Sequence, residues 1–450
     1  REMFPYDQEN IVAIATPPGI GALAVVRLSG KDLRPLYKDF THKKPKDRFA
    51  MFTKLYHPKN NHILDEVVVT YFKAPGSYTG EDIIEISCHG GTAVKNSIVQ
   101  AAIDGGARLA HPGEFSYRSF LNGKMDLLQA ESIAAIISSK ASRSTELSLY
   151  HLEGRVSKLL VEIKSKIIDV LSIIENELNF SEDEISLTSY STIRSMLEDV
   201  QVQITQIVSS SVIGKKIFTG IRIIILGRPN TGKSSLFNAI LGHDRAITSP
   251  IAGTTRDTVE SWFELEGVPV CLVDTAGIWE SKKQLDNLGV EKSISELDRA
   301  DLCLLVDDEN PPALIKTEFM KRYKHHYILV KSKCDLTISP SIIDENIIYT
   351  SSKENTGINK LLTSISTYIL DNINLADHTH GFMITQRQRG LLEESAICLN
   401  EAIDQLDAGI ETDIVASTLN GFVVAIKDVV GEIPNKDVVQ NIFSNFCVGK

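Results

Sequence analysis

The sequence predicts a multidomain α/β plus α fold. An α+β N-terminal domain is followed by an α-helical domain, and an α/β domain is inserted into the helical one. Three observations lead to this prediction. Short apolar runs with glycine and proline between them extend to about Phe115, apolar residues at helical spacing flank residues 218–373, and a phosphate-binding pattern lies inside that interval. With 450 residues, of which 43% are hydrophobic, the chain is long enough for two to four domains.

The N-terminal region alternates strand-like runs with one helix-like stretch, Thr92–Ile103. The strand-like runs are Ile11–Ala15, Ala22–Leu28, Glu66–Phe72 and Ile83–Cys88. This alternation, with glycine and proline between the runs, is typical of an α+β domain, to which we assign residues 1–118.

Long amphipathic helices are expected from about Leu121. Apolar residues recur every three or four positions, and proline is absent between Gly113 and Pro229. The periodic residues are Leu160, Ile163, Ile167, Leu171, Ile174 and Leu178, and later Leu391, Leu392, Ala396, Leu399, Ile403 and Leu406. We assign residues 119–217 and 376–450 to two parts of one helical domain that residues 218–375 interrupt, because insertions succeed where chain ends lie close together. Two separate helical domains are the alternative.

Residues Gly227–Ser234 fit the pattern G-x-x-x-x-G-K-[ST]. A strand-like run, Ile221–Leu226, precedes them and a helix-like run, Ser235–Leu241, follows, which is the context that a phosphate-binding loop requires. The loop amides and the helix N-terminus would hold nucleotide phosphates, Lys233 would reach the β and γ oxygens, and Ser234 would ligate Mg²⁺. The nucleotide-binding candidates in the loop are Asn230, Thr231, Gly232, Lys233 and Ser234.

A second motif, Asp274–Gly277, directly follows the strand-like run Val268–Val273. Asp274 is placed to hold Mg²⁺ through its coordination shell, and the Gly277 amide to sense the γ-phosphate. The polar loop Gly253–Asp257 lies between the two motifs, and a threonine in it would close over the metal. We favour Thr255 for that role.

Two further loops follow apolar runs and are placed to recognise a base. Ser332–Asp335 and Thr350–Lys353 resemble the guanine-binding loops of the translation-factor-like branch of P-loop GTPases. That resemblance implies that Asp335 binds both guanine donor nitrogens while the stems of Lys333 and Lys353 stack on the ring, with Ser351 and Ser352 completing the second loop. Ser332 departs from the usual asparagine, and its shorter hydroxyl would hold the neighbouring loops less firmly. Taken alone, Asp274 could be a strand-end cap and Ser332–Asp335 an ordinary loop.

Charge and cysteine content exclude several classes of protein. Lys and Arg number 47 while Asp and Glu number 58, so the net charge is −11 and the surface as a whole does not favour a polyphosphate. Binding to RNA would need a local patch or a partner protein. The six cysteines form no C-x-x-C pair, which argues against zinc and a disulfide framework and favours a reducing, cytoplasmic setting. No run approaches the roughly 18 apolar residues that span a membrane, and the start at Arg1 is unlike a signal peptide, although a trimmed sequence could lack one.

Segments along the whole chain resemble the tRNA-modification GTPases of the MnmE, or TrmE, family. These segments are Ile11–Gly21, Arg27–Gly30, Tyr78–Asp82, Cys88–Gly91, Pro112–Phe115, Phe120–Leu127 and Phe446–Lys450. The resemblance implies a homodimer that, with the flavoprotein MnmG, adds a carboxymethylaminomethyl or aminomethyl group to carbon 5 of the wobble uridine of tRNA. The carbon would come from 5-formyltetrahydrofolate or methylenetetrahydrofolate bound by the N-terminal domain.

The resemblance also assigns folate-binding residues. They are Arg27, Glu85 and Lys124, with Lys450 nearby. Arg or Lys can pair with the glutamate-tail carboxylates of a folate, and a carboxylate can accept the paired N–H donors of the pterin edge. Without the resemblance, Arg27 and Lys124 would be interpreted as solvated surface cations.

Cys447 lies in a C-terminal tail that, by the resemblance, brings a thiol to the folate and uridine chemistry. It would act either as a nucleophile or as a group that positions substrate. A buried inert thiol is the alternative. The last four residues formally fit a prenylation signal, but Gly449 is not aliphatic and Lys450 is a poor terminal residue for it.

GTP hydrolysis would need help, because Ile278 occupies the position of the water-orienting glutamine of Ras-like enzymes. The resemblance implies a K⁺ ion where two GTPase domains meet. Its ligands would be Asn230 and backbone oxygens of Ser249–Thr254, in particular Ser249, Ile251 and Thr254. Asp286 matches the family's water-positioning glutamate but is one methylene shorter, so a bridging water or Glu280 would have to make up the difference.

Two other classes compete with a modification enzyme. One is a regulatory GTPase switch in ribosome assembly that performs no chemistry beyond hydrolysis, and the other is a membrane-remodelling GTPase. The first would carry a basic RNA-binding domain, and the second an apolar paddle or a cationic helix tip. The sequence shows neither feature.

Overall fold

The computed structural model describes residues 9–179, 190–243, 259–274, 296–316, 326–336, 344–373, 382, 384–432, 436–446 and 448–449. The chain divides into two compact units. The first unit comprises Arg1–Ala134, His151–Leu197 and Ile397–Lys450, and the second comprises Ala135–Tyr150 and Glu198–Ala396.

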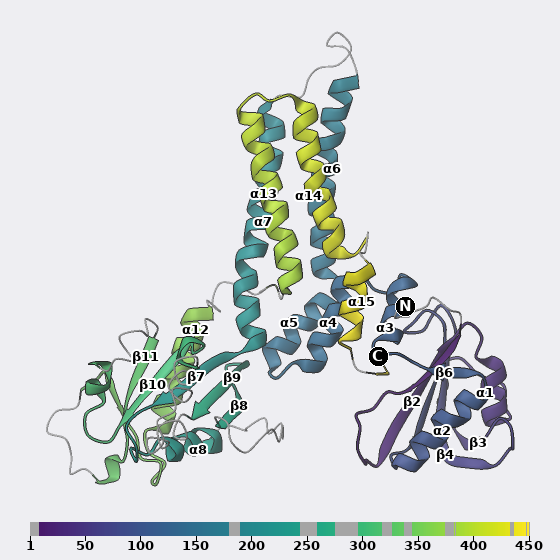
Figure 1. Cartoon of the computed structure of the whole chain (residues 1–450), viewed down its shortest axis with the longest axis horizontal. Coiled ribbons are helices and arrows are strands. Elements are labelled where there is room, and N and C mark those ends of the chain that lie inside the picture. The colour runs from purple at the N-terminus through teal and green to yellow at the C-terminus, as the bar shows by residue number, and fades with distance from the viewer. Residues whose placement is uncertain are drawn as a thin grey trace, which may run out of the picture. The chain divides into compact units, whose positions relative to one another are not determined.

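The first unit contains a six-stranded sheet in the order β3-β4-β5-β2-β1-β6. The strands are β1 (Asn10–Ile14), β2 (Leu23–Gly30), β3 (Met51–Tyr56), β4 (Ile63–Phe72), β5 (Asp82–His89) and β6 (Ala107–Leu109). Neighbours pair antiparallel except β1 and β6, which run parallel. Helices α1 (Arg34–Thr41) and α2 (Thr92–Asp104) share a hydrophobic core with one face of the sheet (Figure 1). On the other face, Phe115 packs with Ile11 and Ala13 of β1, whereas Phe52 of β3 is exposed.

The helices that the structure describes within residues 114–219 and 386–444 are mostly long. They are α3 (Glu114–Leu121), α4 (Leu127–Ser138), α5 (Ser142–Leu152), α6 (Arg155–Asn179), α7 (Tyr190–Thr219), α13 (Gln386–Asp407), α14 (Thr412–Val430) and α15 (Lys436–Ser444). The predicted periodicity is confirmed in α6, whose residues Leu160, Ile163 and Ile167 are buried at three- and four-residue spacing. Helix α14 packs along α6, and Lys164 forms an ion pair with Glu432 just beyond α14 (Figure 1). Within the described residues, no helix has the length and hydropathy needed to span a membrane.

The second unit contains a six-stranded sheet in the order β12-β11-β10-β7-β9-β8. The strands are β7 (Ile221–Leu226), β8 (Val259–Leu265), β9 (Val268–Asp274), β10 (Leu302–Asp307), β11 (His326–Lys331) and β12 (Ile347–Tyr349). All pairs are parallel except β8 with β9, and the core of this sheet includes residues of helices α8 (Lys233–His243) and α12 (Ile358–Ile373). The carboxyl ends of the parallel strands therefore meet at one edge, where open α/β sheets bind ligands.

Residues 135–150 lie within the predicted helical segment, yet they cluster with the second unit. Three neighbouring contacts join the start of α5 and the turn before it to the β8–β9 hairpin. The Ser142 hydroxyl donates to Glu264 at 2.5 Å, the Arg143 amide donates to the Gly267 carbonyl at 3.1 Å, and the Lys140 ammonium lies 3.6 Å from the Trp262 ring centroid. Contacts between segments this far apart in the sequence leave no local pattern, so they could not be predicted from the sequence.

Candidate functional site

The phosphate-binding loop leaves β7 through a close backbone approach. A Cβ atom at Gly227 would lie 2.0 Å from the Val306 carbonyl oxygen, so only glycine fits beside β10. Asn230 and Gly232 have φ values of 62° and 86°, and α8 begins at Lys233. The strand, loop and helix thus follow one another as the motif predicts.

The described residues bring both ends of the predicted Mg²⁺ site together. The Ser234 hydroxyl donates to Asp274 Oδ2 at 2.7 Å, although 40 residues separate the two. Lys233 is buried, and its ammonium donates to the Arg228 carbonyl at 2.7 Å. Thr231 donates to the same carbonyl at 2.8 Å. The loop therefore presents a hydroxyl, a carboxylate and an ammonium within a short stretch of the sheet edge.

The two guanine-loop candidates also meet at this edge. The Ser351 hydroxyl donates to Asp335 Oδ1 at 2.6 Å, and this bond, assisted by the charge of the exposed Lys353, lowers the pKa of the Asp335 carboxyl. Ser352, between them, is half-buried. Further along, a Cβ atom at Gly357 would lie 1.9 Å from the Tyr349 carbonyl oxygen at a φ of 75°, so a glycine is required where the loop turns back.

Ser332 and Lys333 connect the first guanine loop to the phosphate-binding loop. Ser332 is buried, and its hydroxyl donates to the Thr231 carbonyl at 2.5 Å. Lys333 adopts a φ of 54°, and its ammonium donates to the Asn230 carbonyl at 2.6 Å. Ser332, at the position usually held by asparagine, therefore still forms one hydrogen bond to the phosphate-binding loop.

Arg27 and Glu85 lie directly opposite each other on β2 and β5. Arg27 Nε donates to Glu85 Oε1 at 2.8 Å, and Nη2 lies 2.7 Å from the same oxygen. The Arg27 guanidinium also lies 5.8 Å from the Tyr78 ring centroid and 5.9 Å from that of Phe115. Arg27 is thus not a solvated cation: it is packed against two rings and paired with the other folate candidate on this sheet.

Lys124 is exposed and lies beside the loop Tyr78–Gly80, which Arg27 also contacts through the Tyr78 ring. A Cβ atom at Gly80, where φ is 80°, would approach Lys124 Cγ at 3.3 Å and Cδ at 3.4 Å, so the absence of a side chain makes room for the lysine stem. The Asn122 amide nitrogen donates to the Thr79 carbonyl at 2.8 Å. The loop at Tyr78–Gly80 therefore separates the Arg27–Glu85 pair from Lys124.

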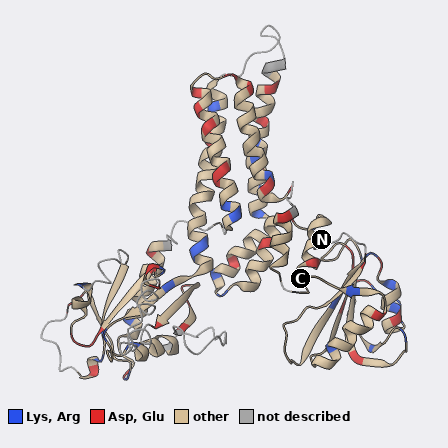
Figure 2. Cartoon of the chain, viewed as in Figure 1, with Lys and Arg blue, Asp and Glu red and all other residues tan. Residues whose placement is uncertain are grey.

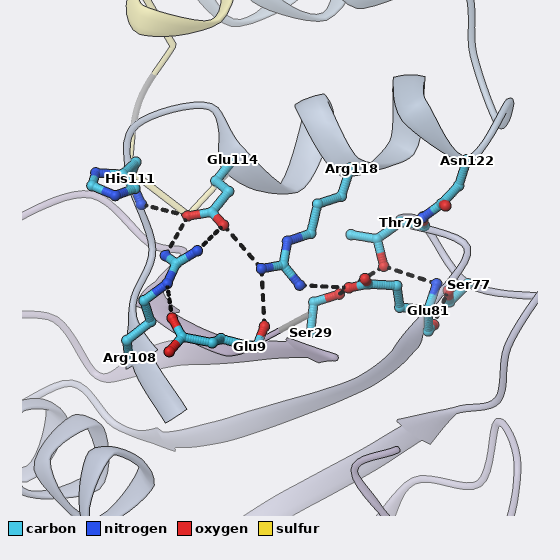
Figure 3. A network of polar contacts seen from close by, with 10 residues as sticks. All are labelled: Glu9, Ser29, Ser77, Thr79, Glu81, Arg108, His111, Glu114, Arg118 and Asn122. Carbon is cyan, nitrogen blue, oxygen red and sulfur yellow. Dashed lines mark hydrogen bonds and ion pairs between the residues drawn. The ribbon is translucent and has the colours of Figure 1, made fainter. Parts of the chain in front are cut away.

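A buried polar network fixes this loop against α3 (Figure 3). Arg118, with 8% of its side chain exposed, donates to Glu81 Oε2 at 2.9 Å, to the Glu9 carbonyl at 2.9 Å and to Glu114 Oε1 at 3.0 Å. Arg108 also pairs with Glu114. Burial would raise the pKa of the Glu114 carboxyl, but the hydrogen bonds from Arg108 and the His111 amide outweigh it and leave that pKa below its usual value.

The C-terminal tail reaches the Arg27–Glu85 pair. Arg27 Nη1 donates to the Gly449 carbonyl at 3.1 Å. A Cβ atom at Gly449, where φ is 95°, would lie 2.6 Å from the Ile14 carbonyl oxygen, so this contact also requires glycine. Eight predicted site residues lie outside the described residues: Ser249, Ile251, Thr254, Thr255, Gly277, Asp286, Cys447 and Lys450.

Sequence reasoning missed several residues of this arrangement. Arg228, Asp307 and Asp308 contact the phosphate-binding and guanine loops, and Gly449 carries the tail contact to Arg27. One signal was available for the two aspartates. Asp307 is the last residue of the buried strand β10 and Asp308 follows it, at the edge where the parallel neighbours of β10 also end.

Comparison with known proteins identifies the family. The family model described as the MnmE helical domain matches residues 127–447, and the model of the GTP-binding protein TrmE N-terminus matches residues 10–124. The tRNA modification GTPase MnmE of Aquifex aeolicus (strain VF5) is 37% identical over 453 residues, covering 98% of this chain and 100% of that protein. The chain belongs to the MnmE family of tRNA modification GTPases.

Other MnmE relatives cover the chain equally well. That of Ligilactobacillus salivarius (strain UCC118) is 35% identical and covers 100% of this chain and 99% of its own length, and that of Streptococcus pneumoniae (strain Hungary19A-6) is 34% identical with 100% of both covered. Among solved structures, the G domain of the T. maritima FeoB iron transporter aligns with 33% of this chain and 98% of its own, at 25% identity and a TM-score of 0.26. Membership in the MnmE family confirms the resemblance, the fold class and the prediction of a GTPase.

Proposed function

We propose that this MnmE-family chain hydrolyses GTP and, with the flavoprotein MnmG, adds a carboxymethylaminomethyl or aminomethyl group to carbon 5 of the wobble uridine of tRNA. The observation that carries the nucleotide part is the convergence of Ser234, Asp274 and Asp335 on the edge of the second sheet where the parallel strands β7, β9, β10 and β11 end. The one-carbon unit is taken to come from 5-formyltetrahydrofolate or methylenetetrahydrofolate.

Asp335 is the residue that selects guanine in this proposal. Its carboxylate can accept hydrogen bonds from guanine N1–H and N2–H but would leave the edge of adenine unmatched. The hydrogen bond from Ser351 holds Oδ1 and favours the ionised form. Lys333 and Lys353 would flank the ring with their stems, and GTP should therefore bind in preference to ATP.

Mg²⁺ fits the donor set at Ser234 and Asp274. A hydroxyl and a carboxylate are hard oxygen donors of the kind Mg²⁺ prefers, and they already lie within hydrogen-bonding distance of each other. Ser234 would be a direct ligand and Asp274 would act through the metal's water shell, with Thr255 completing the set. When bound, the ion would neutralise charge on the phosphate oxygens, while Lys233 would leave the Arg228 carbonyl to contact those oxygens.

K⁺ is the proposed substitute for the missing water-orienting glutamine and for an arginine finger. The Asn230 side chain would offer an amide oxygen, and Ser249, Ile251 and Thr254 would offer further oxygens, as two GTPase domains meet. Asp286 would position the attacking water.

This cation proposal predicts the response of hydrolysis to monovalent ions. The GTPase rate should rise steeply with K⁺ and hardly with Na⁺, because the smaller ion fits the same oxygen cage poorly. Asn230→Ala should abolish the K⁺ response yet leave GTP binding nearly intact, since Lys233, Ser234 and the loop amides remain. Rates would be measured by phosphate release, and GTP affinity by titration calorimetry. Equal rates in K⁺ and Na⁺, or a K⁺ response that survives in the variant, would contradict the proposal.

Folate binding is proposed for the sheet face of the N-terminal domain that carries Arg27 and Glu85, opposite α1 and α2. Arg27 Nε and Nη2 both contact Glu85 Oε1, and in this proposal Glu85 Oε2 accepts the pterin N–H donors. Lys124, with Lys450 nearby, would pair with the glutamate-tail carboxylates. Cys447 would bring a thiol to the same site, either as a nucleophile or as a group that positions substrate.

A homodimer would cover this face. Phe52 and Val68 pair across β3 and β4, and Val68 in turn faces Ser87 on β5, so two exposed apolar residues lie in the row of the sheet next to the Arg27–Glu85 row. Phe52 is 68% exposed. Exposed apolar side chains on an uncovered sheet face favour burial by a second surface. A second copy placed there would close the folate site, which is why we propose dimerisation through this domain.

The tRNA would be held by a local patch or by MnmG rather than by the surface as a whole. The net charge is −11, and Figure 2 shows acidic and basic residues interspersed along the described helices. We propose a cytoplasmic location and retain the domain division at residues 118, 217 and 375 as part of this proposal.

Mass analysis of wobble uridine tests the complete function. In cells that lack this chain, tRNA species that normally carry the C5 substituent should show unmodified uridine, and complementation should restore it. Normal modification together with a defect in ribosome assembly would instead favour the regulatory GTPase.

A further inference from the structure

Arg228 is the second residue of the phosphate-binding loop, and its side chain contacts acidic residues at and after the end of β10. Its guanidinium forms a two-pronged contact with Asp307 at the end of β10, with Nε 2.6 Å from Oδ2 and Nη2 2.7 Å from Oδ1. Paired contacts between a guanidinium and a carboxylate fix orientation as well as distance. The Arg228 carbonyl accepts hydrogen bonds from both Thr231 and Lys233. The two ends of this residue thus connect β10 to the interior of the loop.

Asp307 is built as a fixed anchor. Only 1% of its side chain is exposed, and Oδ1 also accepts the backbone amides of Glu309 and Asn310 at 2.9 Å each. Burial would raise the pKa of this carboxyl, but the hydrogen bonds from Arg228 and the two amides outweigh burial and keep the pKa below its usual value. The carboxylate is therefore charged at neutral pH and held by the chain that bears it.

The next residue, Asp308, lies 4.0 Å from Arg228 Nη2 and also contacts Lys333. Asp308 Oδ2 lies 2.9 Å from the Lys333 ammonium, and that ammonium donates to the Asn230 carbonyl. The path from Arg228 through Asp307, Asp308 and Lys333 to Asn230 closes a ring around two peptide units of the loop. Asn230 has a φ of 62°, which lies in the left-handed region. This conformation costs free energy for a residue other than glycine and persists where the surrounding contacts impose it.

We propose that Arg228 is a positioning residue that, anchored on Asp307, holds Asn230 in the orientation needed to bind the monovalent cation. This inference rests on the proposed K⁺-dependent hydrolysis. Arg228 touches neither the nucleotide nor the cation in this scheme. Its effect on the reaction passes through Asn230, whereas Lys233, Ser234 and the amides at the start of α8 continue to hold the phosphates. Loss of the anchor should therefore weaken the response to K⁺ more than it weakens GTP binding.

The test compares Arg228→Gln and Arg228→Lys with the unaltered full-length chain. Gln removes the charge and the fork, whereas Lys keeps the charge but loses the fork. Arg194→Gln is a matched control, because Arg194 also makes a two-pronged contact, with Asp407 at 2.8 and 3.3 Å, but does so on α7 in the first unit. Three quantities would be measured for each protein: the affinity for a fluorescent GDP analogue, the K⁺ concentration that half-maximally stimulates hydrolysis, and the K⁺ concentration that half-maximally promotes self-association with GDP and aluminium fluoride.

We expect Arg228→Gln to raise both half-maximal K⁺ concentrations about tenfold, the loss expected for one charge-assisted fork, while GDP affinity changes by less than about threefold. Arg228→Lys should lie between Gln and the unaltered chain, and Arg194→Gln should match the unaltered chain. An unaltered K⁺ dependence in Arg228→Gln would overturn the inference alone. A uniform loss of nucleotide affinity with no shift in K⁺ dependence would also overturn it, because the anchor would then hold the whole loop. If the unaltered chain itself does not respond to K⁺, the proposed cation mechanism fails and this inference with it.

Discussion

Replacing Gly449 with alanine tests whether the C-terminal tail is part of the folate site. Gly449 is buried, has a φ of 95°, and supplies the carbonyl that accepts a hydrogen bond from Arg27 at 3.1 Å. An alanine Cβ there would lie 2.6 Å from the Ile14 carbonyl oxygen and 2.8 Å from Ala15 Cα. Both neighbours are backbone atoms at the end of β1, so they cannot yield by changing a side-chain rotamer.

Two costs combine in this substitution. Alanine at a positive φ costs about 1 kcal/mol or more relative to glycine, and forcing a methyl group against fixed neighbours costs about 1–3 kcal/mol. Together they destabilise the docked tail by about 2–4 kcal/mol, which corresponds to a loss of docking of about thirtyfold or more. The tail carries Cys447 and Lys450, so folate affinity should fall at least about tenfold if the tail contributes to the site, whereas GTP affinity should not change.

The assay is calorimetric titration of the full-length chain with 5-formyltetrahydrofolate. Gly409→Ala is the matched control, because Gly409 also has a positive φ, 67°, but a Cβ atom there would meet nothing within 4 Å. The control should bind folate as the unaltered chain does. If Gly449→Ala binds folate as tightly as the unaltered chain, the tail does not belong to the site and the reasoning is refuted.

Two more predictions concern residues whose surroundings the structure defines. Ser332→Asn should raise GTP affinity about threefold to tenfold, the effect of one additional hydrogen bond between the guanine loop and its neighbours, and calorimetry that finds equal or weaker binding would contradict this. His151 is buried on α5, and burial lowers the pKa of its imidazole from 6.5 to about 4. Between these pH values the unfolded chain binds more protons than the folded chain does. The free energy of unfolding should therefore fall by up to about 3 kcal/mol as the pH drops from 6.5 to 4. His151→Leu should flatten this dependence, measured as the denaturation midpoint of the first unit against pH, and an unchanged slope would count against it.

Local patterns in the sequence were sufficient to predict many elements. The apolar run Ile221–Leu226 is β7 without change, and the helix expected at Thr92–Ile103 is α2 with one residue added. Such elements follow from burial of one face, which spacing reports directly. Three elements of the N-terminal sheet and its cover were missed: β3, β6 and α1. β6 has only three residues, and in β3 two of the six residues are buried, so neither presents a strong apolar run.

Contacts between distant segments could not be predicted from spacing. Arg27 and Glu85 are 58 residues apart, and only the register of β2 with β5 brings them face to face. Arg228 and Asp307 are 79 residues apart and meet because β7 and β10 are parallel neighbours. Spacing along the sequence pairs neither arginine with its carboxylate: only the resemblance links Arg27 with Glu85, and the position of Asp307 at a strand end does not point to Arg228. What changes their role is the pairing of the strands, which depends on the whole core rather than on any local segment.

In both arginine–carboxylate pairs the arginine is occupied by contacts within the protein, and a nearby lysine carries the other positive charge. In the nucleotide site, the Arg228 guanidinium is paired with the buried Asp307, and the Arg228 carbonyl accepts a hydrogen bond from Lys233. The positive charge that remains for the phosphates is therefore that of Lys233. In the N-terminal domain, Arg27 is likewise paired with Glu85 and occupied by a backbone carbonyl, while Lys124 is exposed. A guanidinium fork orients its partner in a fixed plane, whereas a lysine ammonium is a mobile point charge. Arg27 therefore orients the Glu85 carboxylate and the tail, and in the proposed folate site the carboxylates of the ligand fall to lysines, Lys124 among them.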